Sequence, residues 1–327
     1  MTEQGESSKY VIVSTRADLL ITQEIACLIS SEKPSSQIFI ACPSPCIDEA
    51  QLWVNEIKNG SGDDDSPNAR SIQVVPFDPH GDRTACRRAS DELIKALGDG
   101  VVNALVMNWQ GCLPGRFGVV LEESGMLEMA QIKILSQMYL IEALIEKKML
   151  FDSSRVIVSG SEAARGIPPM FSAPILGESL DSYVSMLNGT GLDLNNGHSI
   201  YSHLQGILSL YIASLARKHS IIHFWLLSPG FTQDSLNKHI QIEENPQQFK
   251  FEDLVQYGIA QDYKVAATHF FRAMIGSPEW NYPSGILVAA AKGTRGDLCD
   301  QATLDDGKYL SDYKKQDLAF EAIHSFA

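Results

Sequence analysis

Short apolar runs alternate with longer amphipathic segments along most of the chain, and this alternation limits the fold more than any other feature. The apolar runs are four to seven residues long and rich in Val and Ile, which is typical of buried parallel strands. Seven such runs predict strands, and they are Tyr10–Ser14, Gln37–Ala41, Ile72–Val75, Ala104–Met107, Arg155–Ser159, Ile221–Leu227 and Ile286–Ala289.

The segments between these runs place apolar residues at helical spacing. The predicted helices are Leu19–Ser30, Ile47–Ile57, Thr84–Leu97, Glu122–Lys148 and Ser199–His219. Strand–helix alternation of this kind gives a parallel sheet with right-handed crossovers. We therefore predict an α/β fold with a single Rossmann-like doubly wound parallel sheet of about seven strands and helices on both faces. Because no internal repeat or Pro-rich linker is present, residues 1–327 are expected to form one domain.

Charge and hydropathy exclude two classes of partner. Acidic residues outnumber basic ones by 40 to 26, and the net charge is −14, so the chain lacks the basic surface that nucleic-acid binding requires. No apolar run reaches the roughly 18 residues of a membrane-spanning helix, and we expect no transmembrane segment. The polar N-terminus resembles neither a signal nor a transit sequence. This favours the cytosol, with an organellar stroma or matrix open if a transit peptide was removed.

The side chains that commonly bind metals show no metal-site pattern. The six cysteines are scattered, and Cys42 and Cys46 flank a Pro-Ser-Pro stretch without two further ligands nearby. The eight histidines show no metal spacing either. We predict no metal site and interpret the cysteines as free thiols.

Three segments carry a family resemblance. Tyr201 lies in the first turn of the predicted helix Ser199–His219, which has an Ala-Arg pair at 216–217 near its end, and a Ser-Pro-Gly turn at 228–230 closes the next strand. This order and spacing resemble the Tyr-x-x-x-Lys helix and strand of the short-chain dehydrogenase/reductase family. Residues 155–166 resemble the family's serine-bearing strand, and residues 74–82 its Asp-containing third strand. The long loop before the tyrosine is most similar to the retinol-dehydrogenase and protochlorophyllide-reductase branches.

The resemblance implies a nucleotide site that has diverged here. It assigns the cofactor positions to Ser14, Arg16, Asp78, Asn108, Pro229 and Gly230. The family's glycine-rich loop reads Ser-Thr-Arg-Ala-Asp-Leu-Leu-Ile at 14–21, so side chains replace the glycines that let the backbone approach a pyrophosphate. Trp109 replaces a small residue that faces the cofactor. We therefore expect no bound cofactor, or NADP or NAD if the protein is active.

The catalytic set that the resemblance implies has also diverged. In the family, a lysine one turn after the tyrosine lowers the phenol pKa and holds the nicotinamide ribose. Here Tyr201 is present, but Gln205 replaces the lysine and Ile134 stands at the position of the family's asparagine. The serine survives as Ser159 or Ser161. Each remnant also has a purely structural interpretation, such as a packed aromatic for Tyr201 or a turn residue for Asp78.

Three functional hypotheses follow. The favoured one is a protein without the usual hydride transfer, which acts as a scaffold, a complex subunit or a ligand-binding protein. The alternative is an NAD(P)(H)-dependent oxidoreductase acting on a carbonyl or alcohol, with Tyr201 as proton donor and Gln205 on the ribose. A third is an enzyme that uses the cleft without a nucleotide. Because the family's two long helices pack against partner subunits, the resemblance also implies a homo-oligomer, or a larger complex if an unrelated protein uses that surface.

Overall fold

The computed structural model contains one eight-stranded sheet in the order β3-β2-β1-β4-β5-β6-β7-β8. The structure describes residues 8–14, 20–60, 72–79, 83–108, 118–121, 124–168, 171–232, 255–256 and 258–326. Strands β1 to β7 are parallel, and β8 pairs antiparallel with β7. The strands are β1 (Lys9–Ser14), β2 (Gln37–Cys42), β3 (Ile72–Pro76), β4 (Ala104–Asn108), β5 (Arg155–Ser159), β6 (His223–Leu227), β7 (Ile286–Ala290) and β8 (Leu298–Asp300).

The predicted doubly wound sheet is confirmed, with one strand more than the sequence indicated. Strands β1, β4, β5, β6 and β7 are almost entirely buried, because helices cover both faces of the sheet. The additional strand, β8, has only three residues, all half-buried. A strand this short at the sheet edge has no apolar run by which the sequence could reveal it.

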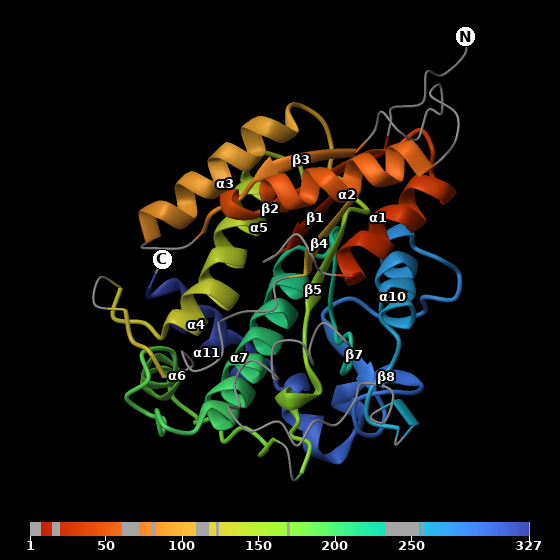
Figure 1. Ribbon diagram of the computed structural model, residues 1–327. Coiled ribbons are helices and arrows are strands. Elements are labelled where there is room, and N and C mark those ends of the chain that lie inside the picture. The colour runs from red at the N-terminus through yellow and green to blue at the C-terminus, as the bar shows by residue number, and fades with distance from the viewer. Residues whose placement is uncertain are drawn as a thin grey trace.

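Two groups of helices form two apolar cores, one on each face of the sheet (Figure 1). One face is covered by α1 (Leu20–Glu32), α2 (Ile47–Gly60) and α10 (Tyr263–Ile275). The other face is covered by α3 (Arg83–Leu97), α4 (Glu128–Ala130), η3 (Gln131–Leu135), α5 (Ser136–Glu146), α6 (Leu180–Leu187), α7 (Gly197–Lys218) and α11 (Tyr313–His324). Short helical turns connect these elements, and they are η1 (Ser44–Cys46), η4 (Glu162–Ala164), η5 (Gln301–Thr303) and η6 (Asp305–Ser311).

The long helix predicted for Glu122–Lys148 is shorter and interrupted. It begins at Glu128, after a turn in which Gly125 has a φ of 67° and Val120 forms an isolated β-bridge with Leu127. A positive φ is accessible to glycine but incompatible with a continuing helix. Its residues Gln131–Leu135 form a π-helical turn, and such turns are rare and often occur at functional sites.

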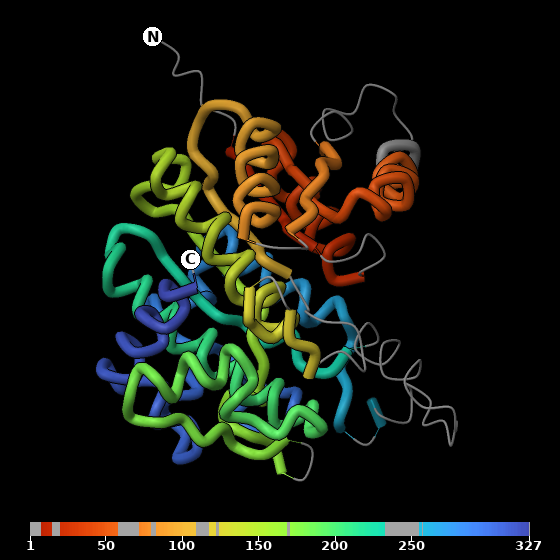
Figure 2. The backbone as a smooth tube through the Cα atoms, turned by 90° about the vertical axis from the view of Figure 1, so that its left-hand side faces the viewer, coloured from red at the N-terminus to blue at the C-terminus, as the bar shows by residue number. Residues whose placement is uncertain are grey.

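The C-terminal helix α11 packs beside α7 and α6 (Figure 2). Its apolar face includes Ala319, Ala322 and Ile323, which belong to the same core as α5 and α7. Consequently α7 is buried along most of its length, between the sheet on one side and other helices on the other. The region between β5 and α7, which the sequence indicated only as a loop of about forty residues, contains α6 and a β-bridge between Ile167 and Phe171.

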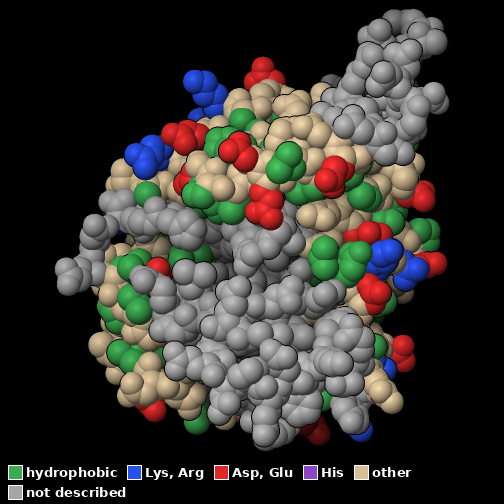
Figure 3. All heavy atoms as spheres, viewed as in Figure 1, with side chains coloured by type: hydrophobic (Ala, Val, Ile, Leu, Met, Phe, Trp, Pro, Cys, Tyr) green, Lys and Arg blue, Asp and Glu red, His purple; other side chains and the backbone are tan. Residues whose placement is uncertain are grey.

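Charged side chains are spread over the described surface. On the face shown in Figure 3, acidic groups are scattered, and the basic groups visible there lie toward its edges. Among the described helices, none combines the length and apolar character that crossing a bilayer requires.

Candidate functional site

The candidate site lies where the carboxyl ends of the central strands meet. The chain runs from β1 outward to β3 on one side of the sheet, and then from β4 outward to β8 on the other. The strand order therefore reverses between β1 and β4, and doubly wound proteins bind ligands at such a point. Ser14 ends β1 and pairs in register with Asn108, which ends β4, while Ser159 ends β5 beside it.

A chain of buried hydrogen bonds connects these three strand ends. The Thr22 hydroxyl on α1 donates to Ser14 Oγ at 3.3 Å and accepts from Asn108 Nδ2 at 3.0 Å. Ser159 Oγ donates to Asn108 Oδ1 at 3.0 Å. All four side chains are at most 2% exposed. Two predicted cofactor positions and one predicted catalytic serine therefore form part of a network that holds the sheet together.

Lys133 brings a positive charge to the same strand ends. It lies in the π-helical turn, is 2% exposed, and its Nζ donates to the Ser159 carbonyl at 3.3 Å. Burial of a lysine is rare and is a common feature of functional sites. Ile134, to which we assigned the family's asparagine position, instead packs in the apolar core. A lysine inside the otherwise apolar segment Ile-Lys-Ile-Leu was the sequence signal for this residue.

The Asp78 carboxylate accepts hydrogen bonds from another residue of the protein. Its carboxylate accepts hydrogen bonds from the backbone N–H of Ser44, at 2.8 Å, and from the Ser44 hydroxyl. Since Ser44 follows β2 and Asp78 follows β3, the pair joins the ends of two neighbouring strands. A cofactor contact by Asp78 stays a prediction, and in the structure its carboxylate joins two strand ends.

Hydrogen bonds within the protein also fix the turn after β6. The Pro229 carbonyl accepts from Gln261 Nε2 at 2.7 Å, and the Gly230 N–H donates to Ser228 Oγ at 3.1 Å. Gly230 has a φ of 68°, and a Cβ atom there would lie 2.2 Å from the Thr294 carbonyl oxygen. Glycine is required at this position because both the backbone conformation and the close approach exclude a side chain.

Tyr201 and Ser161 come together at the other end of the site. Ser161 caps η4 by accepting from the N–H of Ala163 at 3.2 Å. Tyr201, in the first turns of α7, is half-buried, and its ring lies 5.5 Å from that of Phe171. Burial raises the pKa of the Tyr201 phenol, a hydrogen bond with Ser161 opposes the rise, and the charge of Glu162 adds to it. This environment favours the protonated phenol.

Gln205 lies one helical turn after Tyr201, inside the protein. Its side chain is 0% exposed, and neither Oε1 nor Nε2 has a hydrogen-bond partner in the described structure. The amide lies close to the Tyr201 phenol without a well-aligned hydrogen bond, and this weak contact lowers the pKa of Tyr201, although burial raises it more. A buried amide without partners costs free energy. Such a group is able to exchange hydrogen bonds with a ligand, but it cannot supply a positive charge.

Glu162 is a further site residue that sequence reasoning missed. It is 3% exposed, and its Oε2 accepts from the Ser228 hydroxyl at 2.6 Å. Burial raises the pKa of this carboxyl group, against the effect of its hydrogen bonds and of Arg165. An acidic residue directly after the predicted serine turn was the signal available in the sequence.

The predicted cofactor positions give limited support for a dinucleotide. Ser14, Asn108 and Asp78 all make side-chain hydrogen bonds within the chain, and Pro229 and Gly230 use backbone groups in the turn after β6. Arg16 and Trp109 lie outside the described residues. The Gln205 amide, which has no well-aligned hydrogen bond, and the half-buried Tyr201 both lie in the first half of α7.

Comparisons with known proteins show the fold. No family model and no curated protein matches the sequence. The structure is similar to the MalC reductase/Diels-Alderase of Malbranchea aurantiaca, with a TM-score of 0.59, 15% identity, and coverage of 88% of this chain and 96% of that one. Salutaridine reductase of Papaver somniferum has a TM-score of 0.55 at 19% identity, with coverage of 85% and 99%.

A third similar structure is the NADPH-bound carbonyl reductase from chicken fatty liver, with a TM-score of 0.53 and 13% identity. The match covers 89% of this chain and 100% of the reductase. Other matching structures are described as short-chain dehydrogenases/reductases by name. The chain therefore has the fold of short-chain dehydrogenases/reductases, as the motif resemblance predicted. The similarity to one branch of that family stays a prediction.

Proposed function

We propose that this chain is a ligand-binding protein with the fold of short-chain dehydrogenases/reductases and without their usual hydride transfer. The observation that carries the proposal is Gln205, a neutral and unpaired amide at the position of the lysine that would activate Tyr201. Without that charge, burial keeps the Tyr201 phenol protonated. The phenol and Ser161 then form a hydrogen-bonding site rather than a proton-transfer pair.

The carbonyl group is the ligand feature that this site fits best. A protonated phenol donates a hydrogen bond, and a serine hydroxyl either donates or accepts. Phe171 lies beside the Tyr201 ring, which adds an apolar contact for the body of a ligand. Within this proposal Tyr201, Ser161 and Gln205 contact the ligand, while Ser159 belongs to the strand-end network. Residues 1–327 act as one domain.

Direct titration with NADPH and NADH, followed by calorimetry and Trp fluorescence, tests the proposal. We expect weak nucleotide binding or none, and no NADPH oxidation with a panel of ketones and aldehydes. Gln205→Lys is the matched variant, because it restores the missing charge at the same position. The proposal is contradicted if the unaltered protein oxidises NADPH with one of these substrates and the Tyr201→Phe variant does not.

The second candidate is an NAD(P)(H)-dependent oxidoreductase. The adjacency of Ser161 and Tyr201 favours it, with Tyr201 as the proton donor and Gln205 as a contact for the ribose. Saturable micromolar binding of NADPH or NADH, together with Tyr201-dependent turnover, distinguishes this candidate from the first. The choice between the two nucleotides stays a prediction, and so does a cytosolic or organellar location.

Oligomerisation through the long helices, or membership of a larger complex, also stays a prediction. In the structure α11 already packs along α7, so a second copy has to bind outside α11 or displace it. Light scattering at several protein concentrations measures whether the chain associates.

A further inference from the structure

The amide of Gln205 differs from the other buried amides of the protein. Asn108 and Gln301 are 0% exposed like Gln205, but both polar atoms of each amide have partners. Asn108 donates to Thr22 and accepts from Ser159. Gln301 accepts at Oε1 and donates through Nε2 to carbonyl groups of β7. Among the described residues, Gln205 alone has two buried polar side-chain atoms without a well-aligned hydrogen-bond partner.

The hydroxyl groups beside Gln205 already donate to other acceptors. The Ser209 hydroxyl donates to the backbone carbonyl of Gln205 at 2.8 Å. The Tyr309 hydroxyl, which lies 2.8 Å from the position that a Cβ atom would take at Gly206, donates to the Ala164 carbonyl. Either hydroxyl would have to give up its present hydrogen bond before it could donate to Gln205 Oε1. A donor for this oxygen therefore has to come from a bound molecule.

Gln205 lies on the side of α7 that faces the proposed ligand site. It follows Tyr201 by four residues, so the two side chains share one face of the helix. Tyr201 is half-buried, and the turn η4, which Ser161 caps, contacts α7. A ligand that passes the Tyr201 ring consequently reaches the Gln205 amide one helical turn further in.

The two polar atoms of Gln205 restrict the chemistry of such a ligand. Nε2 is a donor and Oε1 is an acceptor, side by side. A group with an N–H next to a C=O pairs with both atoms, as a glutamine does with one edge of adenine in DNA. A ketone pairs with Nε2 only and leaves Oε1 buried without a donor. Because an unpaired buried polar group costs free energy, such a site discriminates against the ligand that lacks the N–H.

We propose that Gln205 is a specificity-determining residue that selects ligands with a lactam or carboxamide group over simple ketones and aldehydes. This deepens the proposed function and rests on it. The ligand carbonyl accepts from Gln205 Nε2, and the neighbouring ligand N–H donates to Oε1. Resonance with the nitrogen makes an amide carbonyl a weak electrophile, which agrees with a site that binds its ligand without transferring a hydride.

Three probes with the same six-membered ring test the proposal. They are 2-piperidone, which has an N–H beside its carbonyl, N-methyl-2-piperidone, which lacks the N–H, and cyclohexanone. We would label the glutamine side chains with ¹⁵N and assign the Gln205 signal by its loss in Gln205→Leu. We expect 2-piperidone to shift this signal at an about tenfold lower concentration than the other two probes, because only 2-piperidone pairs with both atoms.

Gln316 is the matched control within the same sample. It is 4% exposed, and its amide accepts from Arg217 and donates to the Leu310 carbonyl, so its signal should not move. Equal shifts of the Gln205 and Gln316 signals contradict the proposal. In Gln205→Leu, saturation-transfer measurements on the probes should give all three similar affinities. A lactam preference that persists in this variant overturns the role of Gln205.

The outcomes separate this inference from the function on which it rests. If cyclohexanone shifts the Gln205 signal at the same concentration as 2-piperidone, the selection of amides is wrong, while the binding of carbonyl compounds stands. If no probe shifts the signal, the proposed ligand-binding function fails together with the inference. If Gln205→Leu fails to fold, the order of the three probes with the unaltered protein still decides between these results, since backbone assignment then identifies the signal.

Discussion

The two halves of α7 differ in whether the buried amide groups beside them have hydrogen-bond partners. In the first half of the helix, Gln205 is fully buried and neither atom of its amide has a well-aligned hydrogen-bond partner among the described residues. At the other end, α11 brings Gln316, which is 4% exposed, against Arg217. There Gln316 Oε1 accepts from Arg217 Nε at 2.8 Å, and its Nε2 donates to the Leu310 carbonyl at 2.8 Å.

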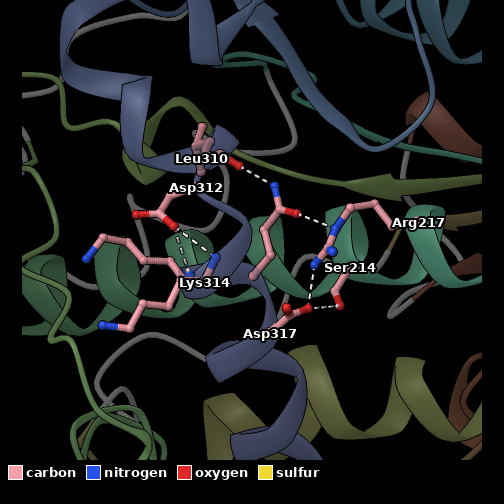
Figure 4. Close-up of polar contacts among 8 residues, drawn as sticks. Ser214, Arg217, Leu310, Asp312, Lys314 and Asp317 are labelled. Atoms are coloured by element: carbon pink, nitrogen blue, oxygen red, sulfur yellow. Dashed lines mark hydrogen bonds and ion pairs between the residues drawn. The ribbon is translucent and has the colours of Figure 1, made fainter.

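This difference separates a stabilising end from the end at which we propose the ligand site. Asp317 adds contacts with Arg217 and with Ser214, whose Oγ donates to it at 3.5 Å (Figure 4). A buried polar group with partners contributes to stability, whereas one without partners costs free energy and persists where function requires it. The comparison predicts that polar-to-apolar substitutions destabilise the α11 end of α7 and stabilise its Tyr201 end.

The largest effect is expected where α11 enters the core. Ile323→Ala should lower the free energy of unfolding by about 3 kcal/mol, because the side chain is completely buried beside α7 and its loss leaves a cavity. Urea denaturation measures the change. Ile221→Ala is the control, since this isoleucine is 52% exposed and its truncation should change stability by less than about 0.5 kcal/mol. Equal effects of the two substitutions contradict a structural role for α11.

Gln316→Leu should destabilise the protein by about 2 kcal/mol. The substitution removes hydrogen bonds to Arg217 and Leu310 and leaves the Leu310 carbonyl without this donor. Denaturation midpoints at constant slope report the difference. A neutral result would mean that water replaces both contacts, and the stabilising end of the comparison would then rest on apolar packing alone.

Gln205→Leu should have the opposite sign and raise the free energy of unfolding by about 1 kcal/mol. Leucine has a similar size and removes a buried amide that has no partner among the described residues. The same variant should bind carbonyl ligands more weakly if the amide takes part in the site. A loss of stability would show that Gln205 has a structural partner, and this outcome breaks the comparison.

Sequence reasoning recovered the sheet because its signals are local. Apolar runs such as those of β1 and β5 reflect burial on both faces, and their order determines the parallel connection. The edge strand β8 has only three residues, which is too short a run for the sequence to indicate. The helix predicted from Glu122 begins only at Glu128, because the chain turns at Gly125. Within the π-helical turn, Lys133 reaches the Ser159 carbonyl, while the neighbouring Ile134 packs in the apolar core.

The sequence indicated which residues lie near the candidate site, but it did not indicate their hydrogen-bond partners. The sequence placed Tyr201, Ser161 and Gln205 near one another through the spacing of the helix and the strand end. The partners of Asp78 and Asn108 are distant in the chain, since Ser44 and Thr22 reach them only in the folded protein. Glu162 and Lys133 gain their importance from burial, a property of the tertiary structure.

The smallest expected effect concerns His324, which ties α11 to α5. Its Nε2 lies 2.7 Å from Glu142 Oε1, and the same carboxylate accepts from the Tyr211 hydroxyl on α7 at 3.1 Å. Burial lowers the pKa of His324, but the hydrogen bonds to Glu142 and to the Phe320 carbonyl outweigh burial, and the nearby Lys218 opposes them only in part. The folded-state pKa is therefore above the ordinary value near 6.5.

Because the folded pKa is raised, the contribution of His324 is complete below pH 6.5 and is lost as the pH rises through the folded value. We expect the stability difference between the unaltered protein and His324→Gln to shrink by about 0.5 kcal/mol between about pH 5.5 and pH 8.5. The effect is small because the two side chains are 30% and 34% exposed to solvent. Urea denaturation at the two pH values measures it. A difference that grows with pH would mean that neutral His324 is the stabilising form, with Glu142 held by Tyr211 alone.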